Sequence, residues 1–295
     1  MAAEWVRYRR AVDQPLEAMH ARFEQHVYHR HSHDTYSFGV TETGAQTFTC
    51  RGGRHTSGTG MVMAFNPDDA HDGWSATDGG FTYRIVHIGP QLLAGVRTDA
   101  LGYRGDGPLF PVPVLEDPAL AAALRRLHAA LMGPASVLER DERLAAAVAV
   151  LDRRASRGGA AGPASPPADR SLAARVREHL RAAYLDDVGA DDLARLAGHS
   201  RFAVYRAFRA AYGLSPSDYQ RQLRLRAARD LIAAGTPPAR AAVEAGFADQ
   251  AHLNRWFVRC FGMTPGAFRR AAGPGPGPGP GVDHASRAGT DLLEH

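Results

Sequence analysis

Hydrophobic residues in the first part of the chain gather in short runs separated by turn-forming residues. The clearest runs are Tyr36–Val40, Thr47–Cys50, Met61–Phe65 and Phe81–Ile88, which are rich in β-branched and aromatic side chains. Glycine, asparagine, aspartate and proline fill the intervals between them. This spacing is typical of antiparallel strands, so residues 1–112 are predicted to form a sandwich or a small barrel.

After residue 112 the hydrophobic positions follow the period of a helix. Leu120, Leu124, Leu127 and Leu131 recur at steps of three and four residues, and a second helical pattern starts at Leu138. Residues 113–154 are therefore expected to form a helical spacer. This spacer could mediate dimerisation or simply cap the β domain.

Two stretches lack any hydrophobic period. Residues 155–170 are small and rich in proline and glycine, which predicts a flexible linker. Glycine and proline alternate strictly from Gly273 to Gly281, so residues 273–295 are predicted to be a disordered tail. Residues 171–272 are helical in pattern throughout. The chain is thus predicted to be α+β, with a β domain, a helical spacer and an all-α domain.

The all-α domain contains two copies of one helix-turn-helix plan, at residues 191–216 and 239–265. Each copy has a short helix, a turn, and a second helix that ends at a glycine with a proline three positions later. Glycine suits the left-handed backbone of such turns, and a polar N-cap accepts from free N–H groups of the helix that it opens. The matching positions are Gly198 and Gly246 in the turns, Ser200 and Asp249 at the N-caps, and Gly213 and Gly262 at the ends.

The second helix of each copy has an apolar stripe and a polar face. The stripes, at four-residue steps, are Val204, Phe208 and Tyr212 in the first copy and Leu253, Phe257 and Phe261 in the second. Arginine, glutamine, asparagine and histidine on the remaining faces are residue types that read base edges. Any one of them could instead contact only phosphate. The residues predicted to contact DNA are Ser200, Arg201, Phe202, Tyr205, Arg206, Arg209, Asp249, Gln250, His252, Asn254 and Arg255.

The distribution of charge also singles out this domain. All 35 basic residues are arginine, a bias that a GC-rich coding genome largely explains. Residues 171–272 carry 16 arginines against 9 acidic residues, whereas the rest of the chain carries 19 against 22. A basic third on a slightly acidic body indicates a polyanionic partner. A long arginine-rich helix expected from Ser215 to Ala234 would hold the two recognition helices at a fixed separation.

Composition also bears on the compartment. Only two cysteines occur, Cys50 and Cys260, far apart in sequence, which argues against a disulfide framework and fits a reducing compartment. The N-terminus has charge but no apolar run behind it, so no signal peptide is expected. No stretch reaches the roughly 18 apolar residues of a membrane span. The chain is expected to be cytoplasmic, without a membrane partner.

The segment Ala245–Pro265 resembles the signature of AraC/XylS-type transcription regulators, with Arg259 where lysine is often found. The resemblance covers residues 171–272, including both helix-turn-helix copies. It implies that the two recognition helices enter successive major-groove segments of double-stranded promoter or operator DNA, about 34 Å apart. It also implies a homodimer, and contact with RNA polymerase if the protein is an activator.

The β domain carries a looser resemblance. His31-Ser-His33, Gly44 and residues 60–71 resemble the two cupin motifs in outline, and many AraC-type regulators carry such a jelly-roll barrel as an effector-binding domain. Small-molecule pockets are mostly apolar with a few polar groups. The residues predicted to line an effector pocket are His31, His33, Phe38, Asn66, His71, Trp74 and Tyr83.

Histidines raise the question of a metal. His29, His31 and His33 alternate, so they would share one face of a strand, and His71 could close onto them. Imidazoles alone can bind a first-row metal. Metal-binding cupins, however, place a carboxylate a few residues after the His-x-His pair, and Asp34, directly after His33, would face away. A pocket without a metal or cofactor is therefore favoured, with a metal site and surface histidines that bind nothing as alternatives.

Together these patterns predict a sequence-specific DNA-binding transcription regulator controlled by a small molecule in the barrel. No Ser-His-Asp order, phosphate loop or pair of carboxylates indicates catalysis, so no enzyme activity is expected. Two alternatives remain open: a metal-dependent cupin enzyme fused to a DNA-binding domain, and a DNA binder without an effector.

Overall fold

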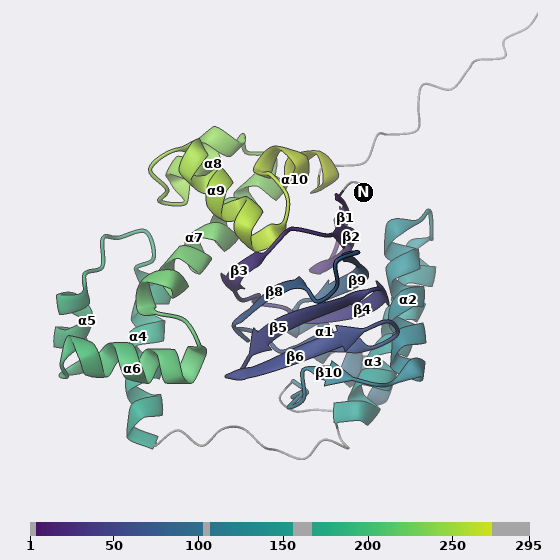
Figure 1. Ribbon diagram of the computed structural model, residues 1–295, viewed down its shortest axis with the longest axis horizontal. Coiled ribbons are helices and arrows are strands. Elements are labelled where there is room, and N and C mark those ends of the chain that lie inside the picture. The colour runs from purple at the N-terminus through teal and green to yellow at the C-terminus, as the bar shows by residue number, and fades with distance from the viewer. Residues whose placement is uncertain (1–3, 103–106, 156–166, 273–295) are drawn as a thin grey trace, which may run out of the picture.

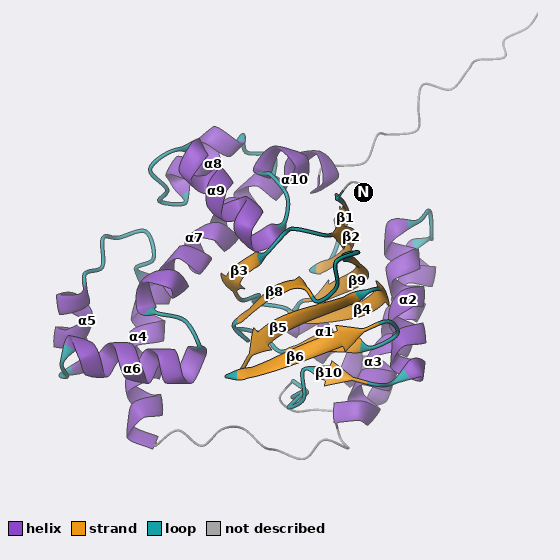
Figure 2. Cartoon of the chain, viewed as in Figure 1, coloured by secondary structure: helices purple, strands orange, loops and turns teal. Residues whose placement is uncertain are grey.

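The computed structural model describes residues 4–102, 107–155 and 167–272. A β domain lies between two groups of helices, one formed by residues 118–155 and the other by residues 167–272 (Figures 1 and 2). The expected α+β class is confirmed, with an antiparallel β domain followed by a helical region. The expected tail, 273–295, and most of the expected linker, 155–170, lie outside the described residues.

Two antiparallel sheets form the β domain in the described part of the chain. The strands are β1 (Trp5–Arg10), β2 (Leu16–Phe23), β3 (Tyr28–His31), β4 (Tyr36–Thr43), β5 (Ala45–Cys50), β6 (Gly53–Gly58), β7 (Val62–Phe65), β8 (His71–Ser75), β9 (Phe81–Ile88) and β10 (Val114–Leu115). The larger sheet has the order β1-β2-β9-β4-β7-β10, and the smaller has the order β3-β8-β5-β6. The four hydrophobic runs of the sequence fall on β4, β5, β7 and β9.

Alternation along the strands gives the larger sheet two apolar faces. On β4, Tyr36, Phe38 and Val40 point away from the smaller sheet and join a core with the helices on that side. A separate core lies between the two sheets and includes Phe23 and Phe48. A residue's position in the alternation therefore decides whether it faces the inside of the barrel or the helices.

Helix α1 (Pro90–Leu101) follows β9, and α2 (Pro118–Met132) and α3 (Val137–Ala155) follow β10. Asp117 caps α2 by accepting from the backbone N–H of Leu120 at 3.0 Å. The leucines that recur along α2 are all buried against the sheet, as their spacing predicts. Helix α1 lies in a region for which only strands were expected; it begins at Pro90 and buries Leu93 in the same core.

The C-terminal region consists, as far as it is described, of α4 (Pro167–Ala182), α5 (Ala190–Ala197), α6 (Arg201–Tyr212), α7 (Pro216–Ala233), α8 (Pro238–Glu244), α9 (Gln250–Phe261) and α10 (Pro265–Ala272). Helices α5–α6 and α8–α9 form the two helix-turn-helix pairs, and α7 runs from one pair to the other (Figure 1). Each pair has its own core, one around Phe208 and Tyr219 and the other around Leu253 and Phe257.

Helix α7 also docks on the β domain. Arg226 donates to the Oγ of Ser32 at 2.9 Å and to one carboxylate oxygen of Asp68 at 3.0 Å. Arg181 of α4 donates to the other oxygen of Asp68 at 2.9 Å. The carboxylate of Asp68 thus holds two helices of the C-terminal region against the β domain.

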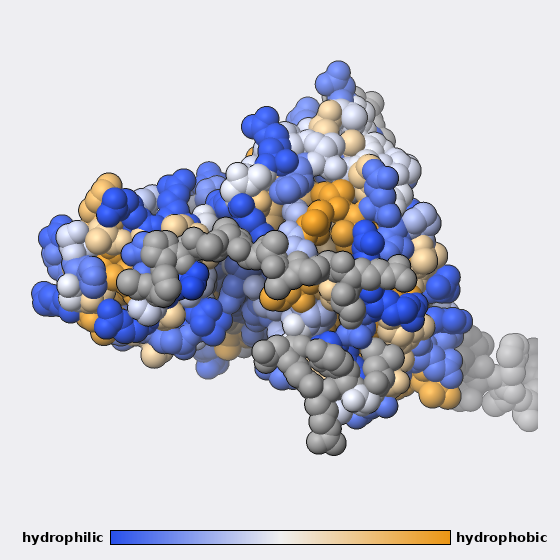
Figure 3. Space-filling model, turned by 90° about the horizontal axis from the view of Figure 1, so that it is seen from below, coloured by the Kyte–Doolittle hydropathy of each residue, from blue (hydrophilic) through white to orange (hydrophobic). Residues whose placement is uncertain are grey.

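Hydrophilic side chains cover most of the face shown in Figure 3, and apolar side chains form separate patches on it. The most exposed apolar side chains include Leu138 on α3 and Phe202 on α6. None of the described helices is long and apolar enough to cross a membrane.

His128 gives the packing of α2 on the sheet a pH dependence. Its side chain is buried, its Nε2 donates to the carbonyl oxygen of Met19 at 3.1 Å, and burial lowers its pKa to about 4. In the unfolded chain the pKa returns to about 6.5. Below pH 6.5 the unfolded chain therefore binds a proton that the folded chain does not, so stability falls as the pH falls towards 4.

We expect His128→Gln, which keeps a donor but cannot titrate in this range, to lose less stability than the wild type on acidification. The difference should reach about 2 kcal/mol at pH 4.5 relative to pH 7. Denaturant unfolding at the two pH values measures it. Equal losses in the two proteins would contradict a neutral, buried His128.

Candidate DNA-binding helices and sensor pocket

The helices α6 and α9 begin at side-chain caps. The Oγ of Ser200 accepts from the N–H of Ala203 at 3.2 Å, and a carboxylate oxygen of Asp249 accepts from the N–H of His252 at 2.6 Å. Both residues were predicted to contact DNA. In the structure their side chains satisfy the free donors of the first helical turn, which fixes where each recognition helix starts.

The remaining residues predicted on α6 are exposed. Phe202 is 67% exposed and Tyr205 is 39% exposed, and at a spacing of three residues the two rings share one face of the helix. The guanidinium of Arg206 lies over the ring of Phe202 at 4.9 Å, and Arg209 donates to the hydroxyl of Tyr205 at 2.8 Å. Arg201 pairs with an acidic side chain of α5. The face combines aromatic rings and positive charge.

On α9 the predicted residues are less uniform. Gln250 and Arg255 are exposed, whereas His252 and Asn254 are partly buried. The ring of His252 packs edge-on against Phe247 at 5.3 Å, which orients it on the surface of the second helix-turn-helix pair. Gln250 and Arg255 are therefore the side chains of this set with the most freedom to reach a base or a phosphate.

Both recognition helices end against the β domain. Gly213 ends α6 with φ 70°, and a Cβ there would lie 2.9 Å from a guanidinium nitrogen of Arg30. Gly262 ends α9 with φ 69°, and a Cβ there would lie 2.8 Å from the ring of Phe23 and 3.0 Å from the hydroxyl of Tyr28. Glycine is thus required at both positions for the left-handed backbone and for the close approach to the barrel.

The arginines of α7 are used inside the protein. Arg224 donates to the carbonyl oxygens of Tyr184 at 2.7 Å and Gly246 at 3.0 Å, which ties the segment between α4 and α5 to the turn of the second helix-turn-helix pair. Arg221 lies over the ring of Trp256 at 4.0 Å. Part of the basic excess that indicated a polyanionic partner is therefore engaged in internal contacts.

A pocket lies between the barrel and the C-terminal helices. Strands of both sheets provide one wall, and α7, α9 and the segment after α9 provide the other. The residues that line it are Tyr8, Glu17, Met19, Tyr28, His31, His33, Gln46, Phe48, Met63, Phe65, His71, Asp72, Gly73, Tyr83, Ile85, His87, Arg229, Cys260, Phe261, Met263 and Phe268. Both halves of the protein thus contribute to one pocket.

Four of the residues predicted to line an effector pocket lie in this wall: His31, His33, His71 and Tyr83. The hydroxyl groups of Tyr83 and Tyr28 are hydrogen-bonded to each other at 2.8 Å. These four side chains come from three separate stretches of sequence that the barrel brings together.

Three of the predicted pocket residues do not line the pocket, and those expectations are corrected. Phe38 points to the opposite face of the larger sheet and packs against Phe110 at 5.2 Å. Asn66 is held at the end of the barrel by hydrogen bonds with Phe110. Trp74 lies next to Gly73 on β8 and, because successive side chains alternate, faces outward beneath the guanidinium of Arg54 at 5.6 Å.

His29 also departs from its expected orientation. It was expected to share a face with His31 and His33, but the pairing of β3 with β8 shifts register between Tyr28 and His31. The ring of His29 lies instead 5.1 Å from that of Trp256 on α9. The irregularity turns His29 towards the recognition helix and leaves His31 and His33 inside.

His87 is the pocket histidine that the sequence prediction missed. It follows Tyr83 and Ile85 at two-residue steps on β9, so the alternation that places Tyr83 inside also places His87 there. Its Nδ1 lies 2.8 Å from the Oγ of Ser37. The lining residues from α7, α9 and α10 carried no such signal, because local periodicity says nothing of how two domains dock.

The pocket histidines are neutral in the folded protein. Burial lowers the pKa of His71 and of His87 to about 4. Burial, together with the neighbouring imidazoles, holds the pKa of His31 and His33 well below the usual value. Each ring therefore keeps one nitrogen lone pair near neutral pH.

A buried ion pair closes the pocket on the side of α7. Arg229 and Glu17 are 9% and 5% exposed, and Nη1 of the arginine lies 3.7 Å from Oε2 of the glutamate. Burial raises the pKa of Glu17, but Arg229 and its other neighbours outweigh burial, so the pKa lies below its usual value. The carboxylate of Asp34 lies 3.8 Å from Nη2 of Arg229.

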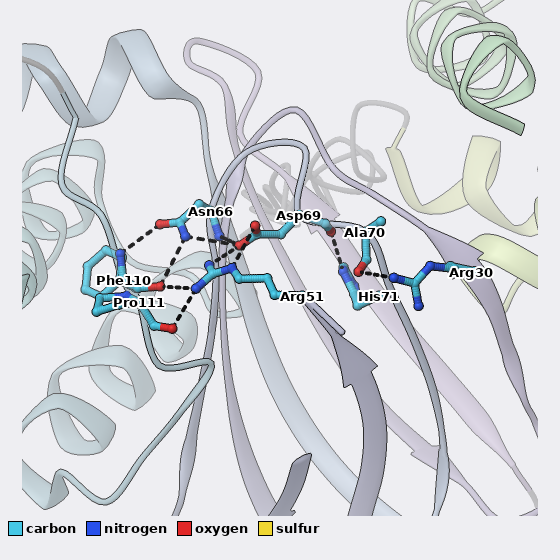
Figure 4. A network of polar contacts seen from close by, with 8 residues as sticks. All are labelled: Arg30, Arg51, Asn66, Asp69, Ala70, His71, Phe110 and Pro111. Carbon is cyan, nitrogen blue, oxygen red and sulfur yellow. Dashed lines mark hydrogen bonds and ion pairs between the residues drawn. The ribbon is translucent and has the colours of Figure 1, made fainter. Parts of the chain in front are cut away.

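The segment that carries His71 is held by a polar network at the end of the barrel (Figure 4). The carboxylate of Asp69 accepts from the side chain of Arg51 and from the backbone N–H of Asn66. Arg51 also donates to the carbonyl oxygen of Phe110 at 2.6 Å. The carbonyl oxygen of Asp69 lies 2.8 Å from Nδ1 of His71, so this network fixes the orientation of the ring.

Arg30 extends these contacts to the first recognition helix. It donates to the carbonyl oxygen of Ala70, next to His71, at 3.3 Å and to the carbonyl oxygen of Gly213 at 2.8 Å. Arg30 itself lies directly before His31 on β3. A single guanidinium thus joins two pocket segments to the end of α6.

Two protein-family models match the chain. The AraC-like ligand binding domain matches residues 14–148, and a helix-turn-helix domain matches residues 193–271. An uncharacterized HTH-type transcriptional regulator of Bacillus subtilis, YbfI, is 27% identical over 238 residues, which are 81% of this chain and 86% of that protein. The HTH-type transcriptional regulator GlxA of Rhizobium meliloti is 35% identical over 99 residues, or 33% of this chain and 31% of its own length.

Solved structures with the same two-part fold include ToxT from Vibrio cholerae. One superposes with a TM-score of 0.55 at 10% identity and covers 90% of this chain and 96% of ToxT. Another, with unsaturated fatty acid bound to ToxT, has a TM-score of 0.53 at 10% identity and covers 90% and 94% of the two chains. At this identity the likeness shows the fold alone.

Removing the carboxylate of Asp68 should loosen the docking of the C-terminal region. In Asp68→Ala the buried Arg226 loses its charged partner, which costs about 3 kcal/mol at a buried site, while the half-exposed Arg181 adds little. Hydrogen exchange of the full chain should become faster in α4 and α7, the two helices that Asp68 holds. The exposed Asp78→Ala is the matched control, and equal exchange in the two variants would show that Asp68 does not hold the halves together.

Proposed function

This chain belongs to the AraC family of DNA-binding transcription regulators, and from that premise we propose that its barrel pocket senses a small molecule and sets the placement of the two recognition helices. One observation carries the proposal: the DNA-binding region supplies a wall of the pocket, through Phe261 at the end of α9 and through Met263 and Phe268, which follow it. A molecule that enters the pocket contacts the sensing half and the DNA-binding half at once.

The energetic basis is differential binding. A ligand shifts a conformational equilibrium only by the difference in its affinity for the two states. A ligand that touches both walls loses contacts when the C-terminal region moves away from the barrel, so its affinity depends on docking. Occupancy of the pocket would thereby favour one arrangement of α6 and α9.

The lining favours a ligand with an apolar body and a polar end. Phe48, Met63 and Phe65 make one side apolar, and the histidines provide polar groups on another. The structurally similar ToxT holds an unsaturated fatty acid, which supports a ligand of mixed character in this fold. Regulation, rather than catalysis, is the proposed role of the pocket because its wall is part of the DNA-binding half.

On the DNA side, we assign α6 and α9 to successive major-groove segments. The exposed set of Phe202, Tyr205 and Arg206 supports this role for α6, and Gln250 and Arg255 support it for α9. The caps Ser200 and Asp249 would position the helix ends next to phosphate. The protein would act in the compartment that holds its DNA.

Assembly and transcriptional output are further parts of the proposal. Val137 and Leu138, at the start of α3, are 58% and 70% exposed, and α2 and α3 lie on the opposite side of the barrel from α6 (Figure 1). A homodimer formed through this helical spacer would leave both helix-turn-helix pairs free. If the protein activates transcription, RNA polymerase is the remaining partner.

Arg206→Ala and Arg255→Ala should each weaken DNA binding by about 1–3 kcal/mol if the arginine reads a base through two hydrogen bonds. The measurement is a titration of the full chain with a DNA fragment that it has selected from a random-sequence pool. Arg7→Ala, at an exposed arginine on β1 outside the recognition helices and the helical spacer, is the matched control and should bind as the wild type does. Unchanged affinity in both recognition-helix variants would refute their assignment.

Salt dependence distinguishes base contacts from phosphate contacts in the same variants. The affinity of the full chain should fall steeply with salt because arginines displace counterions from phosphate. A variant that loses a phosphate contact should show a slope of log affinity against log salt that is shallower by about one. A flat salt response of the wild type would contradict DNA binding through the basic faces of α6 and α9.

A further inference from the structure

Three buried or partly buried imidazoles converge at one corner of the pocket. His31 comes from β3, His33 from the segment after it, and His71 from β8. One ring nitrogen from each lies within 4.8 Å of the others, and the ring centroids are 4.5 to 5.3 Å apart. A tetrahedral metal at about 2.0–2.1 Å from each nitrogen needs nitrogens about 3.4 Å apart, so binding an ion would draw the rings towards one another.

Two of these rings are already oriented as metal ligands are. Nδ1 of His31 lies 2.7 Å from the carbonyl oxygen of His29, and Nδ1 of His71 lies 2.8 Å from that of Asp69. A carbonyl can only accept, so Nδ1 carries the proton and Nε2 presents its lone pair to the cluster. Backbone carbonyls play this role behind metal-bound histidines, where they fix the tautomer and the ring.

The third ring has no competing partner. Among the described residues, no hydrogen bond is made by either ring nitrogen of His33, although the ring lies between those of His31, His71 and His87. Its distance to the ring of His87 is 4.8 Å. The position of His33, without a hydrogen-bond partner among the described residues, is explained if its ring shares an ion with His31 and His71.

The surroundings decide what kind of ion fits. The carboxylates of the pocket are engaged elsewhere: Glu17 faces Arg229, and Asp72 accepts from the backbone N–H of Thr49 at 2.6 Å. Oxygen ligands for magnesium or calcium are therefore lacking at the cluster. Neutral imidazoles suit zinc, nickel, cobalt or copper, and three of them leave a coordination position open.

We propose that His31, His33 and His71 form a mononuclear site for a divalent first-row transition metal, with an open position that faces the pocket beside His87. The carboxylate whose absence argued against a metal is not needed, because the ligand set consists of imidazoles. His87 pairs with Ser37 of β4, and its ring lies 4.8 Å from that of His33.

Hydrogen bonds of Arg30 connect the site to the DNA-binding region. Arg30 lies between His29 and His31 in sequence and bonds both to Ala70, next to His71, and to Gly213 at the end of α6. An ion that draws the histidines together acts on two segments that this guanidinium holds. The metal site goes beyond effector binding and does not depend on it.

The test uses the untagged full chain, freed of metal with a chelator and titrated with Co²⁺. We expect one Co²⁺ per chain, a visible absorption band from imidazole ligation, displacement by Zn²⁺ and no competition from Mg²⁺. His33→Gln and His71→Gln should each lower the affinity by at least about tenfold. His199→Gln is the matched control, because His199 has the same bond from Nδ1 to a carbonyl, at 2.7 Å, but lies outside the cluster.

Circular dichroism of the metal-free variants verifies that they are folded, and DNA binding measured on the same samples reports on the regulator function separately. Wild-type protein that takes up no stoichiometric Co²⁺ or Zn²⁺ at micromolar concentration would overturn the site, whatever the variants do. So would affinities in His33→Gln and His71→Gln equal to that of His199→Gln.

Discussion

A buried cation at the junction of the two halves governs the rest of the structure. Arg229 lies on α7, the helix that connects the two helix-turn-helix pairs. Its Nη1 lies 3.7 Å from Oε2 of Glu17 inside the barrel. A charge in this position is costly without a partner, so the docked arrangement is favoured only when the arginine and the carboxylate meet. The position of α7, and with it the positions of α6 and α9, follows from where the barrel places its acidic side chains.

The uneven distribution of charge along the chain helps to hold the two halves together. The basic C-terminal third sits on a body that is slightly acidic, and the two meet through Arg226 with Asp68 and through Arg229 with Glu17 and Asp34. Arginine serves both purposes because its charge persists when it is buried and its planar group donates in several directions. Arg206 and Arg255, on the recognition helices, remain exposed.

The pocket exists because the two halves dock. The barrel supplies the histidines and one apolar side, and the end of α9 with the following segment closes the other. Gly262 permits this closure, since any side chain there would collide with Phe23. In such a sensor, a bound ligand contacts the barrel and the DNA-binding region directly. Its effect on the recognition helices therefore does not have to pass through a long chain of residues.

Local patterns were sufficient to predict strands β4, β5, β7 and β9, the buried leucines of α2 and the two helix-turn-helix pairs, because period and capping are properties of short segments. Which face of a strand points into the barrel is set by tertiary packing, and Phe38 and Trp74 were assigned to the wrong side for this reason. His87 could have been predicted to line the pocket, because it is four residues from Tyr83 on β9 and therefore lies on the same face of the strand. Phe261 and Arg229 could not be assigned to the pocket, since no local pattern encodes domain docking.

Linkage between the pocket and the recognition helices is the central claim, and it must be reciprocal. Hydrogen exchange of the full chain, with and without a DNA fragment that it has selected, tests this without knowledge of the effector. Bound DNA should alter exchange in β2, β3 and β9, whose residues line the pocket, as well as in α6 and α9. Changes confined to residues 167–272, with the barrel strands unaffected, would contradict the account.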